Sequence, residues 1–143
     1  LFNPREHNGI NTGRGGAPSP TAVAYGSDVM SVPDQFMARI GASYIQGGWS
    51  FSGGFRIEGL PAEDVFGGSY GFRRPGYVIS AEPVAAYRVK NTQFYLSVPV
   101  ALERNRIQSV ADKNRTAKTG TYFKGDAAFA DYSVNLGVAI NLK

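Results

Sequence analysis

Residues 132–142 of the chain read YSVNLGVAINL and alternate strictly between two kinds of side chain. The larger apolar set is Tyr132, Val134, Leu136, Val138, Ile140 and Leu142, and the small or polar set is Ser133, Asn135, Gly137, Ala139 and Asn141. A period of two residues places these sets on opposite faces of an extended strand. The stretch therefore predicts a β-strand with one apolar face and one face of small side chains.

The same alternation occurs in four earlier segments, at residues 36–44, 49–57, 77–89 and 94–102. No segment has a convincing helical period, so the sequence predicts an all-β chain of five strands. Short turns are expected at 45–48 and 90–91, and long connections at 1–34, 58–76 and 106–128. This alternation of short and long connections is typical of an antiparallel meander. We expect an extended outer loop at 1–34 and the five-strand segment at 35–143.

Composition excludes several classes of function. The chain has 143 residues, a net charge of +4, no cysteine and a single histidine, His7. Thiolate metal sites are thereby excluded, and a catalytic triad would have to recruit His7, so we expect neither an enzyme nor a cofactor. The basic residues do not form the aromatic-interleaved stripe of a nucleic-acid-binding surface. No apolar run reaches the roughly 18 residues that a membrane helix requires.

The lengths and the second face of the strands favour a membrane barrel. Soluble strands average about five or six residues, whereas the segments 49–57 and 77–89 are nine and thirteen residues long. The face opposite the apolar one carries mainly Gly, Ser, Ala and Asn, which suit the crowded interior of a transmembrane β-barrel. The alternative is a soluble β-sandwich binding module, in which the apolar face is the core and the long loops are the binding surface.

Aromatic residues flank the short turns on the apolar face: Tyr44, Trp49, Tyr87 and Phe94. A turn at 46–47 would set Tyr44 opposite Trp49, and a turn at 90–91 would set Tyr87 opposite Phe94. Amphipathic rings in these positions are typical of the girdle at a membrane interface. Aromatic cross-strand pairs also stabilise ordinary hairpins, so this feature by itself does not distinguish the two folds.

The closing segment AFADYSVNLGVAINLK, with the alternation of loops and turns, resembles the last strands of a Gram-negative outer-membrane β-barrel. The segments LFNPREHNGINTGR and GSYGFRRPGYVISAEPVAAYRV more loosely resemble outer-membrane transporters of the phenol-degradation type. These resemblances imply a bacterial outer-membrane location and passive transport of small solutes, and the looser one implies hydrophobic or aromatic solutes. The chain departs from such barrels in ending with Leu142 and Lys143 rather than with an aromatic residue.

Five strands are too few to close a barrel, because outer-membrane barrels need about eight or more. We therefore expect a mature or truncated product that is the carboxyl-terminal part of a larger barrel, or one that other copies complete. If the last strand ends in the periplasm, the long connections face outward. The lipid bilayer is then the main partner, with lipopolysaccharide or another protein at the outer loops.

The strand face opposite the apolar one would point into the barrel. It carries six charged candidates for the lining of the lumen: Arg39, Arg56, Glu82, Arg88, Glu103 and Asp131. They form either a salt-bridged ladder in a filled barrel or the wall of a water-filled path. A turn at 90–91 also places Pro83 in a hydrogen-bonded pair with Val98, where proline has no N–H to donate. This conflict predicts a bulge at Glu82 and Pro83.

The outer connections hold six basic candidates: Arg73, Arg74, Lys113, Arg115, Lys118 and Lys124. They either bind lipopolysaccharide phosphates or an acidic partner, or are ordinary solvated charges. The loop 61–76 is rich in apolar residues and is a candidate plug or partner contact. No group of residues has the spacing of a metal site.

Three functions follow for a chain of this kind. The first is a passive transporter or channel for small solutes. The second is a filled barrel that serves as a structural or interaction subunit of an outer-membrane complex. The third, an outer-membrane hydrolase that uses His7, is the least favoured because the chain offers no catalytic constellation.

Overall fold

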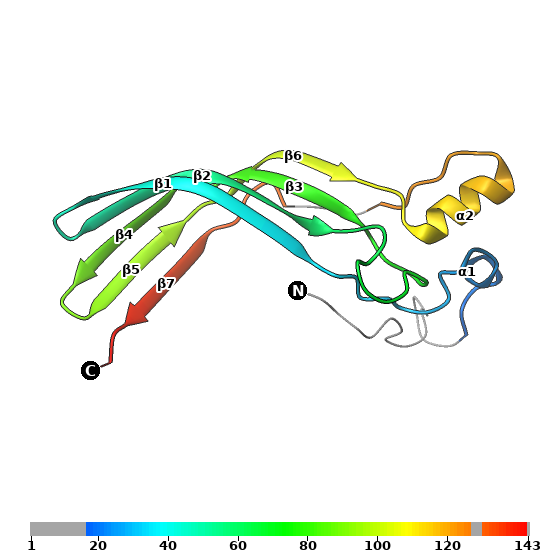
Figure 1. The fold of residues 1–143 in the computed structure, drawn as a ribbon, viewed down its shortest axis with the longest axis horizontal. Coiled ribbons are helices and arrows are strands. Elements are labelled where there is room, and N and C mark those ends of the chain that lie inside the picture. Colours follow the sequence, from blue (N-terminus) through cyan, green and yellow to red (C-terminus); the bar gives the residue numbers. More distant parts are fainter. Residues whose placement is uncertain (1–16, 127–129, 143) are drawn as a thin grey trace. The chain divides into compact units, whose positions relative to one another are not determined.

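The computed structural model describes residues 17–126 and 130–142, and its residues group into two compact units. The first unit is drawn from residues 1–36, 58–77 and 105–128, and the second from residues 37–57, 78–104 and 129–143. Within the described ranges the elements, in chain order (Figure 1), are α1 (Pro20–Tyr25), β1 (Phe36–Gln46), β2 (Trp49–Leu60), β3 (Gly76–Ala81), β4 (Val84–Val89), β5 (Thr92–Ser97), β6 (Val100–Arg106), α2 (Val110–Thr119) and β7 (Asn135–Ile140).

The strands form one open sheet, in which the order is β6-β3-β2-β4-β5-β7 and β1 pairs with β2. The pairs β2–β4, β4–β5 and β5–β7 are antiparallel. The predicted antiparallel β class is thus confirmed. Strand β7 lies within its predicted segment, whereas β1 and β2 begin as predicted and extend two and three residues further, to Gln46 and Leu60.

The other two predicted segments are each broken at a proline. Residues 77–89 divide into β3 and β4 at Glu82–Pro83, and residues 94–102 divide into β5 and β6 at Val98–Pro99. The backbone N–H of Val98 donates to the carbonyl oxygen of Pro83 over 3.1 Å, as the predicted pairing requires. Because proline offers only a carbonyl there, regular pairing stops, and the interruption lies where the sequence predicted a bulge.

The two short turns set the register. The turn at Lys90–Asn91, with Lys90 at φ 53°, places Tyr87 opposite Phe94 as predicted. The first turn lies at Gly47–Gly48, not at 46–47, so the predicted pairing of Tyr44 with Trp49 is wrong. A two-residue turn there sets Ser43 opposite Ser52, and the Ser43 hydroxyl donates to the Ser52 hydroxyl over 3.1 Å. Tyr44 therefore falls opposite Phe51.

The prediction that the chain has no helix is wrong. Helix α1 lies within the predicted outer loop 1–34, and α2 lies within the connection 106–128. Ser109 and Asp112 form a reciprocal capping box at the start of α2, and Gly120, at φ 68°, ends it. Both helices are short, and α2 has too few apolar residues to show a helical period. Its caps were the signal available in the sequence.

Burial in this chain is the reverse of that in an ordinary soluble domain. Of the aliphatic and aromatic side chains in the described ranges, those that are buried are Ala86, Ala111 and three prolines, Pro33, Pro75 and Pro99. The buried polar and charged residues are Ser31, Asp34, Arg73, Ser80, Glu82, Ser97, Ser109 and Asp112. The large apolar side chains lie mainly exposed along the strands, and no described helix has the length and apolar character needed to cross a bilayer.

Candidate functional site

A buried carboxylate organises the small-residue face of the second unit. The Glu82 side chain is 7% exposed, and its Oε1 accepts a 2.8 Å hydrogen bond from the Ser97 hydroxyl. Its Oε2 lies 3.4 Å from Nε of Arg39 and 3.9 Å from Nε of Arg56. The structure thus brings together three of the six charges that the sequence assigned to the inward face. Ser97 was missed, because a serine in a small-residue strand carries no distinguishing signal.

Glycines make this cluster possible. The turn at Gly47–Gly48 sets Gly41 opposite Gly54 and Arg39 opposite Arg56. On the other side of β2, the backbone N–H of Glu82 donates to the carbonyl oxygen of Gly54 over 2.9 Å. A Cβ on Gly54 would lie 2.1 Å from the carbonyl oxygen of Ile40 and 2.6 Å from Cα of Gly41. Two like charges facing each other across a strand pair repel. Glu82, opposite the side-chain-free Gly54, supplies the compensating negative charge.

A hollow of about 280 Å³ lies beside this cluster on the same two strands. It is lined by Arg39, Gly41, Ala42, Ser43, Ser52, Gly53 and Gly54. The hollow is walled by backbone and small side chains, and Arg39 is the charged residue of its lining. This part of the face therefore offers space and one cation next to a carboxylate.

The other three inward candidates, unlike Glu82, are exposed. Arg88 is exposed at the turn end of β4, opposite Gln93, and Glu103 is exposed on β6. Asp131, with a side chain 74% exposed, pairs with Arg104.

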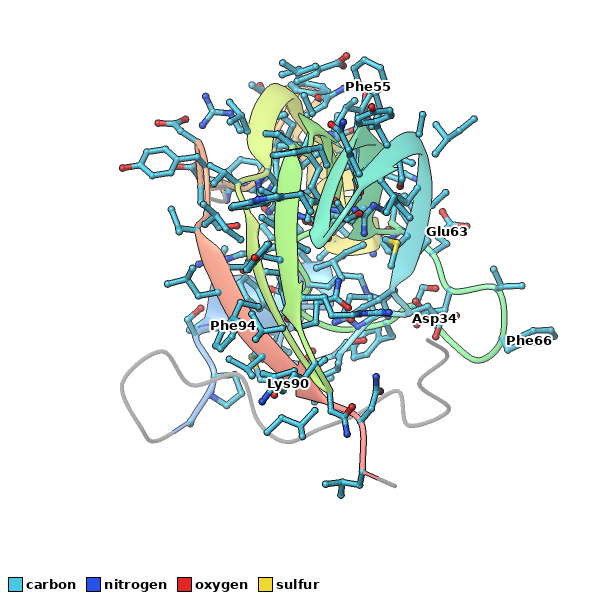
Figure 2. All side chains as sticks on the ribbon, turned by 90° about the vertical axis from the view of Figure 1, so that its left-hand side faces the viewer. Asp34, Phe55, Glu63, Phe66, Lys90 and Phe94 are labelled. Carbon is cyan, nitrogen blue, oxygen red and sulfur yellow. The ribbon has the colours of Figure 1, made fainter. Side chains whose placement is uncertain are left out.

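The opposite face of the sheet is a continuous apolar surface. Trp49, Tyr87, Phe94 and Val138 form one row across β2, β4, β5 and β7, and their exposed fractions run from 40% to 56%. The Trp49 and Tyr87 ring centroids lie 4.6 Å apart. Phe51, Ala85, Leu96 and Leu136 form the next row. In Figure 2 the labelled Phe94 and Phe55 side chains project outward from the sheet.

Three of the predicted girdle aromatics, Trp49, Tyr87 and Phe94, therefore share one row beside the short turns. Tyr44, also exposed, lies on β1 and falls opposite Phe51 of the next row. On the small-residue face, the Tyr95 ring covers Gly137, where a Cβ would lie 2.2 Å from the ring. Small residues on this face thus leave room for the larger ones beside them.

Arg73 is an interior residue of the first unit, which corrects its prediction as an outer-loop basic residue. It is 3% exposed, and its guanidinium donates to both carboxylate oxygens of Asp64 over 2.9 and 3.0 Å. It also donates to the Ser31 hydroxyl over 2.6 Å. Asp64 in turn accepts the backbone N–H of Asp34 over 2.9 Å. Burial requires such pairing, so Arg73 holds the loop 61–75 in place.

The loop that Arg73 anchors carries apolar side chains outward. Val65 and Phe66 are exposed, and Figure 2 shows Phe66 at the outer end of its loop. Tyr70 donates to the Asp28 carboxylate, and this bond raises the pKa of the Tyr70 hydroxyl above its ordinary value.

The remaining basic candidates surround α2. Lys113 pairs with Glu63 over 2.7 Å and, by its hydrogen bond and charge, holds the pKa of the Glu63 carboxyl below its ordinary value. Lys118 donates to the carbonyl oxygen of Ala24 over 2.5 Å and lies over the Tyr25 ring. Arg74 and Arg115 lie against aromatic rings, and Lys124 is exposed.

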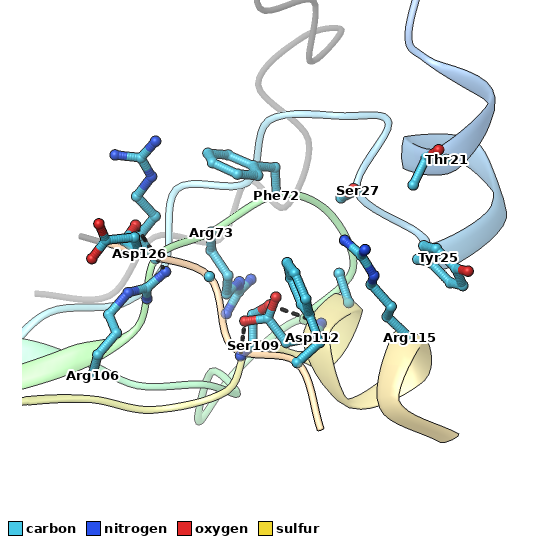
Figure 3. A pocket seen from close by; sticks show the side chains of 14 residues that line it. Thr21, Tyr25, Ser27, Phe72, Arg73, Arg106, Ser109, Asp112, Arg115 and Asp126 are labelled. Carbon is cyan, nitrogen blue, oxygen red and sulfur yellow. Dashed lines mark hydrogen bonds between the residues drawn. The ribbon is translucent and has the colours of Figure 1, made fainter. Parts of the chain in front are cut away.

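A cavity of about 230 Å³ lies within the first unit (Figure 3). Four arginines line it together with Phe72, Phe123 and Tyr25: Arg73, which is paired with Asp64, and Arg74, Arg106 and Arg115. Arg106, at the end of β6, was missed by the sequence analysis because the predicted strand alternation stopped at residue 102. In the described ranges no group of histidine and acidic residues could hold a metal ion, and His7 lies outside those ranges.

No protein-family model, curated protein or solved structure matches this chain.

Proposed function

We propose that this chain is part of an outer-membrane β-barrel and that the barrel is a passive transporter for small solutes. The apolar face of the sheet contacts lipid, and the face of small residues around Glu82 lines the lumen. The proposal rests on the unusual distribution of side chains, in which large apolar residues are exposed and charged residues are buried. In water this distribution would be unfavourable, whereas a bilayer around a hydrated lumen stabilises it.

The observation that carries the proposal is the row Trp49–Tyr87–Phe94–Val138. Three of its four residues are aromatic, and the row lies at the turn ends of the strands rather than in their middle. The next row, Phe51–Ala85–Leu96–Leu136, holds three aliphatic residues and one aromatic residue. A mainly aromatic row that borders a mainly aliphatic one is typical of the interfacial girdle of a membrane barrel.

The edges of the sheet are consistent with the same proposal. In the described part of the chain, β1 pairs with β2 and β7 pairs with β5, so each leaves an edge open for a further strand. Open edges of apolar sheets are prone to pair with other strands. Upstream strands of the same protein, or other copies of the chain, complete the barrel in this proposal.

The Glu82 cluster favours a second candidate function. A carboxylate held by Ser97, Arg39 and Arg56 fills space on the inner face and ties β1, β2 and β5 together. A lumen filled by such contacts would not conduct, and the barrel would then serve as a structural or interaction subunit. Single-channel conductance in planar bilayers separates the two functions, because the transporter gives discrete openings and the filled barrel gives none.

Lipid contact is tested with the single tryptophan of the chain, Trp49. The protein is reconstituted in vesicles whose lipids carry bromine either near the headgroup or deep in the acyl chain. We expect strong quenching of Trp49 by the shallow bromines. Quenching by aqueous iodide but by neither lipid would overturn the membrane proposal in favour of a soluble sandwich.

A matched pair of variants controls this measurement. In a Trp49→Phe background, Phe94→Trp places the reporter on the apolar face, and Gln93→Trp places it on the opposite face one residue away. We expect lipid bromines to quench Phe94→Trp much more than Gln93→Trp. Equal quenching of both variants would contradict the proposal that the apolar face contacts lipid and the opposite face does not.

A further inference from the structure

The cavity of the first unit has the size of a site for a small group. Its volume is about 230 Å³, below the roughly 300–1,000 Å³ of pockets that hold drug-sized ligands. All of its lining residues belong to the first unit. Arg106 and Arg115 lie on opposite sides of it in Figure 3. The space can take an oxyanion, but not a large organic molecule.

Two of the arginines that line the cavity are held against rings. The guanidinium carbon of Arg115 lies 3.8 Å from the Phe123 ring centroid and 5.6 Å from that of Tyr25. The guanidinium of Arg74 lies 5.4 Å from the Phe72 centroid. A guanidinium that stacks on a ring is oriented by it, and its N–H donors point outward in their own plane. Such donors are arranged for bidentate bonds to an oxyanion.

The positive charge at the cavity is only partly compensated. Arg106 donates to the carbonyl oxygens of Pro75 and Asp126 over 2.6 and 3.5 Å, and these acceptors carry no formal charge. The Asp112 carboxylate caps α2 by accepting the Ser109 N–H over 3.0 Å. Arg73 is neutralised by Asp64. Apart from Arg73, three guanidiniums therefore line the cavity together with the carboxylates of Asp112 and Asp126, and the Asp112 carboxylate already accepts the cap hydrogen bond of α2.

We propose that this cavity is a binding site for a phosphate group. A carboxylate carries one charge and is satisfied by one bidentate arginine, whereas a phosphate carries up to two charges and presents three acceptor oxygens to several guanidiniums. The phosphate comes either from free phosphate in solution or from the headgroup of a lipid. This site does not depend on the transporter proposal, because none of its lining residues belongs to the small-residue face around Glu82.

The test uses arginine Nε–Hε signals in NMR spectra of the full chain, in a maltoside detergent that contains no phosphate. Inorganic phosphate is titrated at constant ionic strength, set with sodium chloride. We expect saturable shifts of the Arg74, Arg106 and Arg115 signals with one dissociation constant. Shifts that grow linearly, or that affect basic residues throughout the chain equally, would overturn the site.

The variants Arg74→Gln and Arg115→Gln each remove one guanidinium that lies over an aromatic ring and, within the described ranges, forms no salt bridge with a carboxylate. Each should weaken phosphate binding about ten-fold or more, the effect of losing hydrogen bonds to a charged group. Lys113→Gln is the matched control, because Lys113 lies on α2 but does not line the cavity. Arg115→Lys keeps the charge but loses the planar fork, and should restore only part of the affinity.

The source of the phosphate is decided with vesicles. If free phosphate is the ligand, it saturates the site in detergent, and vesicles with phosphomonoester headgroups have no stronger effect. If a lipid is the ligand, those vesicles bind the chain in an Arg115-dependent manner, whereas vesicles of phosphatidylcholine alone do not. Affinity for phosphate and for vesicles that is unchanged in Arg74→Gln and Arg115→Gln would overturn the proposal.

Discussion

Arg39 lies on β1 and Glu82 in the interruption between β3 and β4, and their side chains meet across β2. The distance between Oε2 of Glu82 and Nε of Arg39 is 3.4 Å. The strand between them carries Gly54 at the crossing point, where no side chain stands in the way. A cluster that spans three strands therefore depends on one residue without a Cβ.

Replacing Glu82 with Gln removes the negative charge that compensates Arg39 and Arg56. We expect a loss of about 2 kcal/mol in the free energy of unfolding, because two facing arginines then repel without a partner. Urea titration followed by Trp49 emission measures the loss. Glu103→Gln, at an exposed position of β6, is the control and should change stability by less than about 0.5 kcal/mol.

The double variant Glu82→Gln, Arg56→Gln tests the cause of that loss. It should recover part of the stability, since it removes the repulsion along with the carboxylate. An additive, larger loss would mean that Arg56 stabilises the sheet independently of Glu82.

Gly54→Ala should destabilise the chain by about 2–3 kcal/mol, because its Cβ would overlap the β1 backbone at Ile40 and Gly41. Gly53→Ala is a control one residue away, since a Cβ there meets nothing within 4 Å. It should be neutral or slightly stabilising, as alanine lowers the entropy of the unfolded chain. Thermal melts of the two variants give the comparison, and equal effects would contradict the close approach of β1 and β2.

Arg73→Gln leaves the Asp64 carboxylate buried without its cation. We expect a cost of about 3 kcal/mol or more and release of the loop 61–75. Limited proteolysis should cut this loop faster in the variant than in the wild type. Lys124→Gln removes the same charge at an exposed position and should leave the cleavage rate unchanged.

The pKa of Glu63 is lowered by Lys113, so the folded carboxyl releases its proton more readily than the unfolded one. The stabilisation by this pair is therefore present above the unfolded pKa and is lost as the pH falls through the lower, folded pKa. An NMR titration of the Glu63 side chain measures the shift. In Lys113→Gln the pKa should return toward its ordinary value, and an unchanged titration would show that Lys113 is not the cause.

Strand alternation was enough to predict the antiparallel β class, the turn at Lys90–Asn91 and the two faces of the sheet. It was also enough to place Pro83 opposite Val98, because register follows from the turn. The position of the first turn was missed by one residue, since Gln46, Gly47 and Gly48 can each occupy a turn. Helix α2 was missed because its start depends on the caps of Ser109 and Asp112 rather than on a period.

The sequence by itself determined which side chains share a face, because the alternation of a strand is a local property of the backbone. Only the tertiary structure decided which charges meet. Glu82 joins Arg39 and Arg56 across β2 because Gly54 leaves space, whereas Arg88, Glu103 and Asp131 have the same predicted parity but are exposed. In the same way, Arg73 and Arg74 are adjacent in the sequence, but packing makes the first an interior ion-pair partner of Asp64 and sets the second over the Phe72 ring. Contacts between distant segments depend on register and close packing, and neither is encoded in a local pattern.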